Sequence, residues 1–474
     1  MIRFGTGGWR AVIGEDFIKD NVMLLAQAVA NDMKAGNDSK GIVIGYDRRF
    51  LSDRAAKWLA EVMAGNGIKT FFINSISPTP LIMFTVKKLE TSYGLAVTAS
   101  HNPAEYNGVK VFTYGGRDAA QEVTQKIEGI ADSLALGDIK SLSFEEGAAH
   151  GLIQNIDPFN DYIDTILSMI DVDVIRKKNL KVLLDPMFGV SKSSLQTILL
   201  TSRCRLDIIN DRHDTLFGGR LPSPSAKTLH KLKDIVLESG YDLGIATDGD
   251  ADRIGIIDDK GTFIHPNDIL VLLYYYLARH KGLRGGVVRN VATTHLLDRI
   301  ASAFGEECHE VPVGFKHISA KMEEKNAVIG GESSGGLTIR GHIKGKDGIF
   351  AATLLVEMIC CLDKKISEIL SDIHDEFGTL YMVESDARFT LEDKKRLQHL
   401  LFIERKLPGF RYEIQDVSYK DGVKVYFKNG GWVIARFSGT EPLLRIFSEM
   451  PEREMAEEIN LDMQRFLNIS GVIY

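Results

Sequence analysis

The chain has 474 residues, of which 44% are hydrophobic and 26% are charged, so it can bury several cores of ordinary domain size. This composition excludes a disordered tail, a collagen-like repeat and a disulfide scaffold. The 57 basic and 64 acidic side chains give a net charge of -7, which argues against a protein that holds nucleic acid through its phosphates.

The first third of the chain alternates between helical and strand patterns. One face of the first predicted helix carries the apolar residues Ile18, Val22, Leu25, Val29 and Met33. Further along come strand patterns at 42–45, 70–73 and 94–98, and a helical pattern at 55–63. Strands that alternate with helices favour βαβ units and a largely parallel sheet.

The same alternation returns after about residue 155 and again after about residue 260. Strand patterns occur at 181–185, 206–209, 243–247, 286–288 and 327–329, with helical patterns at 193–200 and 226–238 among them. No residue-level repeat accompanies this alternation. We therefore expect three similar α/β domains with mixed, helix-sandwiched sheets, at residues 1–154, 155–259 and 260–376.

The last hundred residues have a different pattern. Closely spaced strand patterns occur at 379–390, 423–427, 432–437 and 443–448, with helical patterns at 391–402 and 452–466. The segment Lys428-Asn429-Gly430-Gly431 is a strong turn signal between two of these strands. We expect an antiparallel α+β domain at residues 377–474.

The cysteines and the apolar stretches indicate the compartment. The four cysteines show no CxxC spacing, and two of them, Cys360 and Cys361, are adjacent, so reduced thiols are expected. The apolar stretches near 269–278 and 351–362 are shorter than the ~20 residues of a membrane-spanning helix, and the N-terminal segment lacks the apolar core of a signal peptide. These features predict a soluble, cytoplasmic protein without nucleic-acid or membrane partners.

A serine follows directly after the strand pattern at 94–98. The segment Thr98-Ala99-Ser100-His101-Asn102-Pro103 contains two turn-forming residues, so we expect Ser100 to be exposed at the carboxyl end of a strand. Open α/β sheets bind ligands at that edge. A surface turn with a serine of no special role explains this short segment equally well.

Three carboxylates share one short loop. Asp248, Asp250 and Asp252 alternate with small residues, and oxygen-only ligands select a hard cation such as Mg²⁺ or Ca²⁺. An EF-hand does not fit, because Arg253 stands at the sixth loop position and Asp259 at the twelfth, and the flanks resemble strands. A solvated acidic turn is the alternative, but repulsion among three unpaired carboxylates makes it the weaker interpretation.

Three further loops contain candidate binding residues. The glycine-framed segment 331–336, with Glu332 and Ser334, could hydrogen-bond a polyol. The basic segment 341–348 does not have the GxxxxGK[ST] spacing of a nucleotide-binding loop. Near the C-terminus, Arg436 and Arg445 flank small residues that could surround a phosphate, although a strand turn with solvated arginines would look similar.

Taken together and in this order, the loops resemble those of the alpha-D-phosphohexomutase superfamily. The resemblance runs from end to end. It includes Phe4-Gly5-Thr6-Gly7-Gly8-Trp9-Arg10, the segment 45–52 with Asp47, Arg49 and Ser52, the serine loop at 98–103, and Asn107-Gly108-Val109-Lys110, in addition to the three later loops.

The resemblance implies a fold, a reaction and a set of site residues. The four domains are expected to form a heart shape around a central cleft, and Ser100 is expected to carry a phosphoryl group. Asp248, Asp250 and Asp252 would hold Mg²⁺ together with that phosphoserine. The phosphoryl group would move between O1 and O6 of a sugar through a glucose 1,6-bisphosphate intermediate, which also primes the enzyme.

The resemblance also assigns substrate contacts. Substrate binding is expected from Arg253, Glu332, Ser334, Arg436, Ser438, Gly439, Thr440 and Arg445. Proton transfer or phosphate contact is expected from Lys110, Lys346 and Arg10. A lysine can act as a base only if burial or neighbouring cations lower its pKa, which the sequence does not reveal.

Two positions bear on which sugar is used. The phosphomannomutase-type and phosphoglucosamine-type members have a GExSGH pattern, and Gly336 stands where their histidine would be. The segment from His342 to Gly348 is similar to the HIxxKDG stretch of phosphoglucomutase-type members. We expect glucose phosphates, with mannose, glucosamine or pentose phosphates as alternatives. A phosphosugar phosphatase and an inactive sugar-phosphate sensor are the alternatives of another class. The oligomeric state is left as a monomer or a homodimer.

Overall fold

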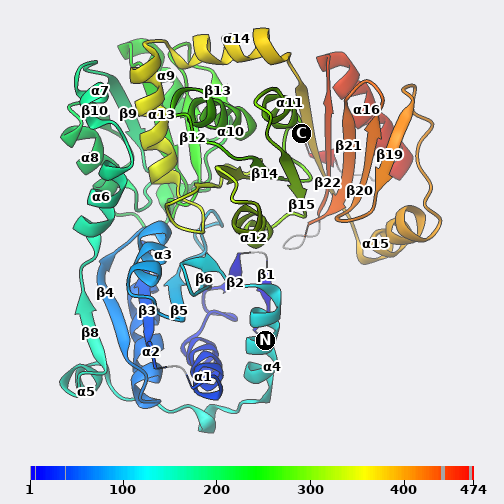
Figure 1. Cartoon of the computed structure of the whole chain (residues 1–474). Helices are drawn as coiled ribbons and strands as arrows, with labels where there is room; N and C mark the ends of the chain where they lie inside the picture. The colour runs from blue at the N-terminus through cyan, green and yellow to red at the C-terminus, as the bar shows by residue number, and fades with distance from the viewer. Residues whose placement is uncertain (1, 6, 38, 439–442, 469–471, 474) are drawn as a thin grey trace.

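The computed structural model describes all residues except 1, 6, 38, 439–442, 469–471 and 474. In Figure 1 the chain builds a first α/β domain at the bottom, a second at the upper left, a third at the upper middle and an α+β domain at the right. This confirms the predicted fold class. No helix in the described ranges is both long and apolar enough to cross a membrane.

The first sheet has a parallel centre. Its strands are β1 (Phe4–Gly5), β2 (Gly8–Val12), β3 (Ile42–Tyr46), β4 (Thr70–Ile76), β5 (Tyr93–Val97), β6 (Tyr106–Thr113), β7 (Arg117–Asp118) and β8 (Ile153–Ile156). Its helices are α1 (Lys19–Ala35), α2 (Ser52–Gly65), α3 (Thr79–Lys88), α4 (Gln121–Ser133) and α5 (Phe144–Ala149). The order is β1-β2-β6-β5-β3-β4-β8, with β7 on β6. The predicted apolar face of α1 is buried at Val22, Leu25, Val29 and Met33.

The second sheet has the order β10-β9-β11-β12-β13. Its strands are β9 (Lys181–Asp185), β10 (Arg205–Ile208), β11 (Leu243–Thr247), β12 (Ile254–Ile257) and β13 (Phe263–Ile264), and its helices are α6 (Phe159–Ser168), α7 (Val172–Arg176), α8 (Lys192–Thr201) and α9 (His230–Ser239). The helix predicted from 226 begins at His230, because Ser225 and Thr228 hydrogen-bond to nearby backbone and form a turn instead. Strand β13 pairs with β12, so the second sheet continues past residue 259, where the sequence placed the end of the second domain. The domain boundaries stay a prediction.

The third sheet is smaller, with the order β15-β14-β16-β17. Its strands are β14 (Val287–Asn290), β15 (Cys308–Val311), β16 (Ile329–Gly331) and β17 (Leu337–Ile339). Its helices are α10 (Pro266–Tyr275), α11 (Leu296–Ala303), α12 (Phe315–Lys325), α13 (Gly348–Leu362) and α14 (Ile366–Phe377). One buried apolar cluster runs from α3 through α6 to α10 and α13, so the first three domains share a core.

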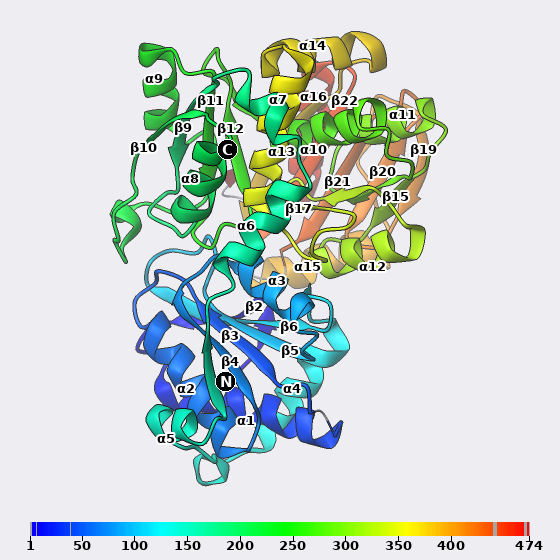
Figure 2. The ribbon, with the colours of Figure 1, turned by 60° about the vertical axis from the view of Figure 1, so that its left-hand side comes forward.

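The C-terminal sheet is antiparallel, as predicted, with the order β19-β20-β21-β22-β18-β23. Its strands are β18 (Tyr381–Arg388), β19 (Ile414–Ser418), β20 (Val423–Phe427), β21 (Trp432–Phe437), β22 (Leu443–Met450) and β23 (Val472–Ile473), and its helices are α15 (Leu391–Gln398) and α16 (Arg453–Leu467). The helix predicted at 391–402 continues beyond α15 as one π-helical turn at His399–Ile403. Figure 2 shows the first domain below the other three.

The first three sheets repeat one arrangement. In each, two parallel neighbours flank a central strand, and an antiparallel strand follows: β4-β3-β5-β6, β10-β9-β11-β12 and β15-β14-β16-β17. The loop that enters the antiparallel strand therefore occupies the same place in each sheet. These loops are the serine loop after β5, the aspartate loop after β11 and the glycine-framed loop after β16.

Candidate active site

Ser100 lies at the junction between the first and second domains. Its backbone has the left-handed φ of 53°, and its N–H donates to Thr98 Oγ1 at 2.9 Å. Its hydroxyl donates to Asp248 Oδ2 at 2.8 Å, so the serine loop and the aspartate loop meet. The expectation that Ser100 would be exposed was wrong: the residue is fully buried, because the second domain's aspartate loop packs over the carboxyl end of β5.

Arg49 binds the backbone of the serine loop through hydrogen bonds. Its guanidinium donates to the carbonyl oxygens of residues 100, 102, 103 and 106 at 2.6–2.9 Å, and Arg49 is only 3% exposed. The neighbouring Asp47 accepts from the Arg49 N–H at 2.9 Å and from Ser52 Oγ at 2.8 Å. The sequence stretch around Asp47 and Arg49 thus supports the loop backbone on which Ser100 stands.

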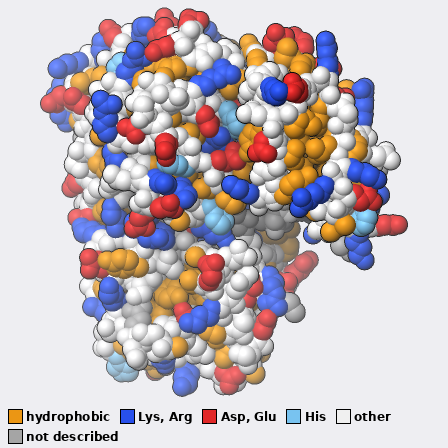
Figure 3. All heavy atoms as spheres, turned by 45° about the vertical axis from the view of Figure 1, so that its right-hand side comes forward, with side chains coloured by type: hydrophobic (Ala, Val, Ile, Leu, Met, Phe, Trp, Pro, Cys, Tyr) orange, Lys and Arg blue, Asp and Glu red, His pale blue; other side chains and the backbone are white. Residues whose placement is uncertain are grey.

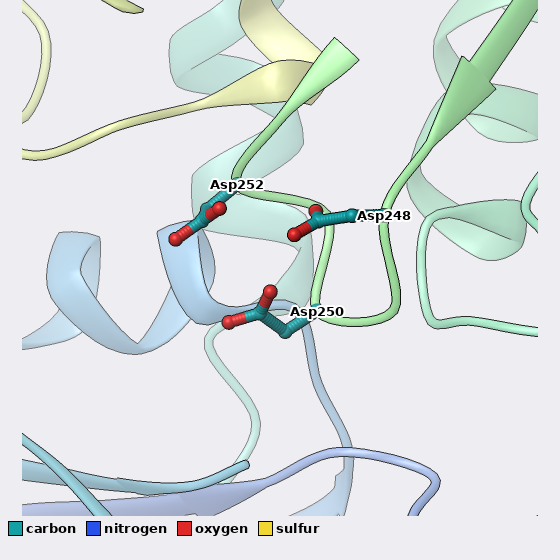
Figure 4. A group of neighbouring side chains, drawn as sticks. All are labelled: Asp248, Asp250 and Asp252. Atoms are coloured by element: carbon teal, nitrogen blue, oxygen red, sulfur yellow. The ribbon is translucent and has the colours of Figure 1, made fainter. Parts of the chain in front are cut away.

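The three aspartates of the second loop point toward one another (Figure 4). Their carboxylate oxygens lie within 4.8 Å of one another, and all three side chains are buried. One oxygen each of Asp250 and Asp252 has no hydrogen-bond partner among the described residues. Buried carboxylate oxygens without partners are costly, and oxygen donors grouped in this way fit a hard divalent cation. The residues therefore fit the Mg²⁺ that the resemblance implies.

The electrostatics within the aspartate loop are uneven. Burial, reinforced by the two neighbouring carboxylates, raises the pKa of Asp248 well above its ordinary value. Burial alone would also raise the pKa of Asp252, but Lys110, Lys346 and Arg253 together hold it well below its ordinary value. Negative charge in this loop is therefore concentrated beside the two lysines.

The predicted lysines both reach the aspartate loop. Lys110 Nζ, buried, lies 2.6 Å from Asp250 Oδ2 and 2.7 Å from Asp252 Oδ2. Burial opposes the charge on Lys110, but the two carboxylates raise its pKa above the ordinary value, so Lys110 stays protonated. Lys346 Nζ lies 3.1 Å from Asp252 Oδ2, and its side chain is 13% exposed.

Two arginines that the resemblance assigns to the site also lie near the serine and aspartate loops. Arg10 Nη1 donates to Asn102 Oδ1 at 2.5 Å, directly beside the serine loop. Arg253 Nε lies 3.8 Å from Asp252 Oδ1.

The glycine-framed loop joins the aspartate loop through backbone contacts. Residues Arg253 and Gly336 form an isolated bridge, and the N–H of Ile254 donates to the carbonyl oxygen of Gly335 at 3.2 Å. Glu332, 8% exposed, accepts from the N–H of Gly314 at 3.1 Å. Ser334 is exposed. Loops from three domains are therefore continuous in space.

The predicted phosphate-binding segment, from Arg436 to Arg445, spans the connection between β21 and β22. Arg436 and Arg445 face each other across these strands, and the N–H of Ser438 donates to the carbonyl oxygen of Leu443 at 2.8 Å. Gly439 and Thr440 lie outside the described residues. Within the described part of the chain, Arg436 makes no hydrogen bond or ion pair with Ser100 or the aspartates. Arg436 Nη2 instead lies 3.4 Å from Oδ1 of Asp421, whose carboxylate accepts the N–H of Val313 in the third domain.

Some residues of the site have no clear signal in the sequence. Thr79, at the start of α3, donates from Oγ1 to Asp250 Oδ2 at 2.6 Å. His101 Nδ1 lies 3.5 Å from Ser100 Oγ, and burial, together with Arg253 and Arg10, lowers its pKa well below the ordinary value, so it stays neutral. The resemblance included Arg49 in the segment 45–52, but the sequence does not reveal that Arg49 donates to backbone carbonyl oxygens of the serine loop.

Sequence comparisons identify relatives along the whole chain. Four phosphoglucomutase/phosphomannomutase family profiles match: alpha/beta/alpha domain I at residues 1–137, domain II at 160–261, domain III at 265–377 and the C-terminal domain at 387–465. A phosphoglucomutase/phosphomannomutase of Thermococcus kodakarensis is 30% identical over 96% of both chains. A phosphoglucosamine/phosphogalactosamine mutase of Sulfurisphaera tokodaii is 29% identical over 98% of both chains.

A solved structure has the same architecture. A crystal structure from Thermus thermophilus that carries the name phosphomannomutase superposes with a TM-score of 0.85 at 29% identity. The superposition covers 98% of this chain and 99% of that one.

Proposed function

The chain belongs to the alpha-D-phosphohexomutase superfamily and is an intramolecular phosphotransferase, and we propose that it moves a phosphoryl group between O1 and O6 of a hexose. The observation that carries the proposal is the meeting of Ser100 Oγ with Asp248 Oδ2 at 2.8 Å. It supports a phosphoserine beside a cluster of carboxylates, in which a divalent cation would neutralise the phosphoryl charge that an incoming hydroxyl meets.

The chain's own residues have separate roles in this proposal. Phosphoserine 100 donates its group to the free hydroxyl of a sugar monophosphate, and a sugar bisphosphate forms. The sugar then reorients, and its other phosphate returns to Ser100. Arg436 and Arg445, with Ser438, Gly439 and Thr440, grip the phosphate that does not react, while Glu332 and Ser334 bind sugar hydroxyls. Glucose 1,6-bisphosphate, or its counterpart with another sugar, would prime Ser100.

The charged residues around Ser100 have distinct proton roles. Lys110, whose pKa two carboxylates raise, is suited to hold charge rather than to remove a proton. Lys346 contacts a single carboxylate and is partly exposed, which supports it as the group that exchanges a proton with the sugar hydroxyl. Arg10 and Arg253 would contact phosphate oxygens. Asp248, Asp250 and Asp252 would hold Mg²⁺, which supplies charge neutralisation during transfer.

The relatives' names bear on the sugar. Beside a phosphoglucomutase/phosphomannomutase, they include a phosphoglucosamine/phosphogalactosamine mutase and a phosphomannomutase, so they favour mannose and amino sugars over glucose alone. We therefore place mannose and glucosamine phosphates first among the substrates, ahead of the glucose expected from the sequence.

Glucose is the second candidate, and the surroundings of Gly336 favour it. A Cβ atom at this position would lie 2.2 Å from Cδ of Lys346, so the lysine fills the space that a larger side chain would need. A histidine at residue 336, as in the GExSGH pattern, could not coexist with Lys346 in this position. The relatives' names predict fastest conversion of mannose or glucosamine phosphate, whereas the contact between Gly336 and Lys346 predicts fastest conversion of glucose phosphate.

The decisive experiment measures conversion of mannose, glucosamine, glucose and ribose 1-phosphates with Mg²⁺ and catalytic hexose bisphosphate. We expect turnover of the hexose phosphates, and a loss of at least about 10⁴-fold in Ser100→Ala, with Ser133→Ala as an exposed control. Phosphate release without isomerisation would instead indicate a phosphatase. No turnover of any sugar with Ser100 phosphorylated would indicate a sensor.

A further inference from the structure

Asp421 joins the C-terminal domain to the third domain. It lies in the turn between β19 and β20, and its Oδ2 accepts the N–H of Val313 at 2.8 Å. Its Oδ1 lies 3.4 Å from Nη2 of Arg436 on the neighbouring strand β21. One carboxylate therefore contacts both the third domain's backbone and an arginine of the proposed phosphate loop.

The next backbone N–H of the third domain continues this connection. Val313 and Gly314 precede α12, and the N–H of Gly314 donates to Glu332 Oε1 at 3.1 Å. Asp421 and Glu332 thus hold adjacent N–H groups of one turn. The proposed sugar-binding carboxylate and the proposed phosphate-binding arginine are linked by a short, continuous chain of contacts.

The contact with Asp421 orients Arg436 without occupying all its donors. The Arg436 side chain is 14% exposed, and its Nε has no hydrogen-bond partner among the described residues. Gly422 lies directly against it, since a Cβ at Gly422 would stand 2.6 Å from Cβ of Arg436. The arginine is confined on one side by this turn and keeps donors for an anion.

We propose that Asp421 is a positioning residue that aligns Arg436 toward the non-reacting phosphate and ties this alignment to the sugar loop. The inference rests on the proposed function. Because Asp421 acts through Arg436, its loss should weaken the hold on the sugar phosphate more than it slows the chemical step.

The test compares Asp421→Asn with Asp416→Asn, an exposed carboxylate on the adjacent strand β19. Asn can still accept the N–H of Val313, so the fold is kept while the charge beside Arg436 is lost. We expect KM for the hexose monophosphate, and Kd for glucose 6-phosphate by calorimetry, to rise about 10-fold with kcat nearly unchanged. In an Arg436→Lys background, Asp421→Asn should add almost nothing.

The outcomes separate the two proposals. Unchanged KM and Kd in Asp421→Asn overturn the positioning role, and so does a fall in thermal stability without a change in affinity. If the unsubstituted protein binds glucose 6-phosphate but shows no turnover, the proposed function fails, and weaker binding by Asp421→Asn still supports the positioning role. If the unsubstituted protein binds none of glucose, mannose and glucosamine 6-phosphates, both proposals fail.

Discussion

At the scale of single residues, Arg49 explains how a serine in a left-handed conformation is kept in place. A φ of 53° is unfavourable for a residue with a Cβ atom and persists only when surrounding contacts hold it. The planar guanidinium reaches three carbonyl oxygens of the loop and one at the start of β6, which the single ammonium of a lysine cannot do. The position of Ser100 therefore depends on an arginine that need not touch the substrate.

We predict that Arg49→Lys lowers kcat by about 10²-fold and the free energy of unfolding by about 2–3 kcal/mol, because buried carbonyl oxygens lose their donors. Mutase turnover, phosphorylation of Ser100 by a hexose bisphosphate, and thermal melting would measure these effects. Arg48→Lys is a matched control, since Arg48 donates to carbonyl oxygens of the second domain, such as that of Asp211 at 3.0 Å. Equal effects of the two substitutions would contradict the role given to Arg49.

The sequence predicted residues whose chemistry is local and missed those whose role depends on distant partners. Asp248, Asp250 and Asp252 stand in one loop, so their spacing alone predicted a cluster, and the structure brings their oxygens together. Thr79 and Asp250 are 171 positions apart, and no local pattern links them. The burial of Ser100 depends in the same way on a loop from another domain.

At the scale of elements, the loop that contains Lys346 leads directly into helix α13. Asp347 caps the helix by accepting the N–H groups of Ile349 and Phe350, each at 2.9 Å. Its other oxygen accepts from Tyr162 Oη at 2.8 Å and lies 2.7 Å from His342 Nε2. The cap thereby fixes the loop that leads to Lys346.

We predict that Asp347→Ala lowers both the melting temperature and kcat, because a buried cap is lost directly beside Lys346. A loss of about 1–3 kcal/mol in the free energy of unfolding is expected for such a cap. Asp171→Ala, which removes the exposed cap of α7 at Val174 N, should lower stability by about 1 kcal/mol and leave kcat unchanged. Thermal melting and steady-state kinetics would measure both variants, and an unchanged kcat in Asp347→Ala would contradict the role of the cap.

Periodicity predicted the helices and strands, but it did not predict the strand order that the first three sheets share. The alternation of patterns predicted α/β domains, and the three sheets confirm them. Which strand stands at the centre of each sheet depends on pairings between strands that are not consecutive in sequence, such as β9 with β11. The equivalence of the serine, aspartate and glycine-framed loops appears only once these pairings are known.

At the scale of the whole molecule, a buried group of charges joins the third domain to the C-terminal domain. Lys424 Nζ on β20 donates to the carbonyl oxygen of Val291 at 2.7 Å and to Glu310 Oε2 at 2.6 Å. Arg289 lies 2.6 Å from the same Glu310 oxygen. Figure 3 shows Lys and Arg side chains spread over this face of the molecule, some of them where the lower lobe meets the upper ones.

The pH dependence of stability should report on this group of charges. Burial and the charge of Arg289, opposed by Glu310, lower the pKa of Lys424 to about 7 from the ordinary 10.5. Between these pH values the unfolded chain binds a proton that the folded protein lacks, so raising the pH stabilises the folded state. The gain is at most about 1.4 kcal/mol per pH unit.

Urea unfolding at pH 7, 8, 9 and 10 would measure this dependence in the unsubstituted protein, in Lys424→Met and in the exposed control Lys420→Met. We expect the difference in unfolding free energy between the unsubstituted protein and Lys424→Met to grow with pH. Lys420→Met should keep the full dependence, because its ammonium is solvated in both states. If the unfolding free energy of all three proteins depended on pH in the same way, Lys424 would have its ordinary pKa. The attraction of Glu310 would then offset the effects of burial and of Arg289.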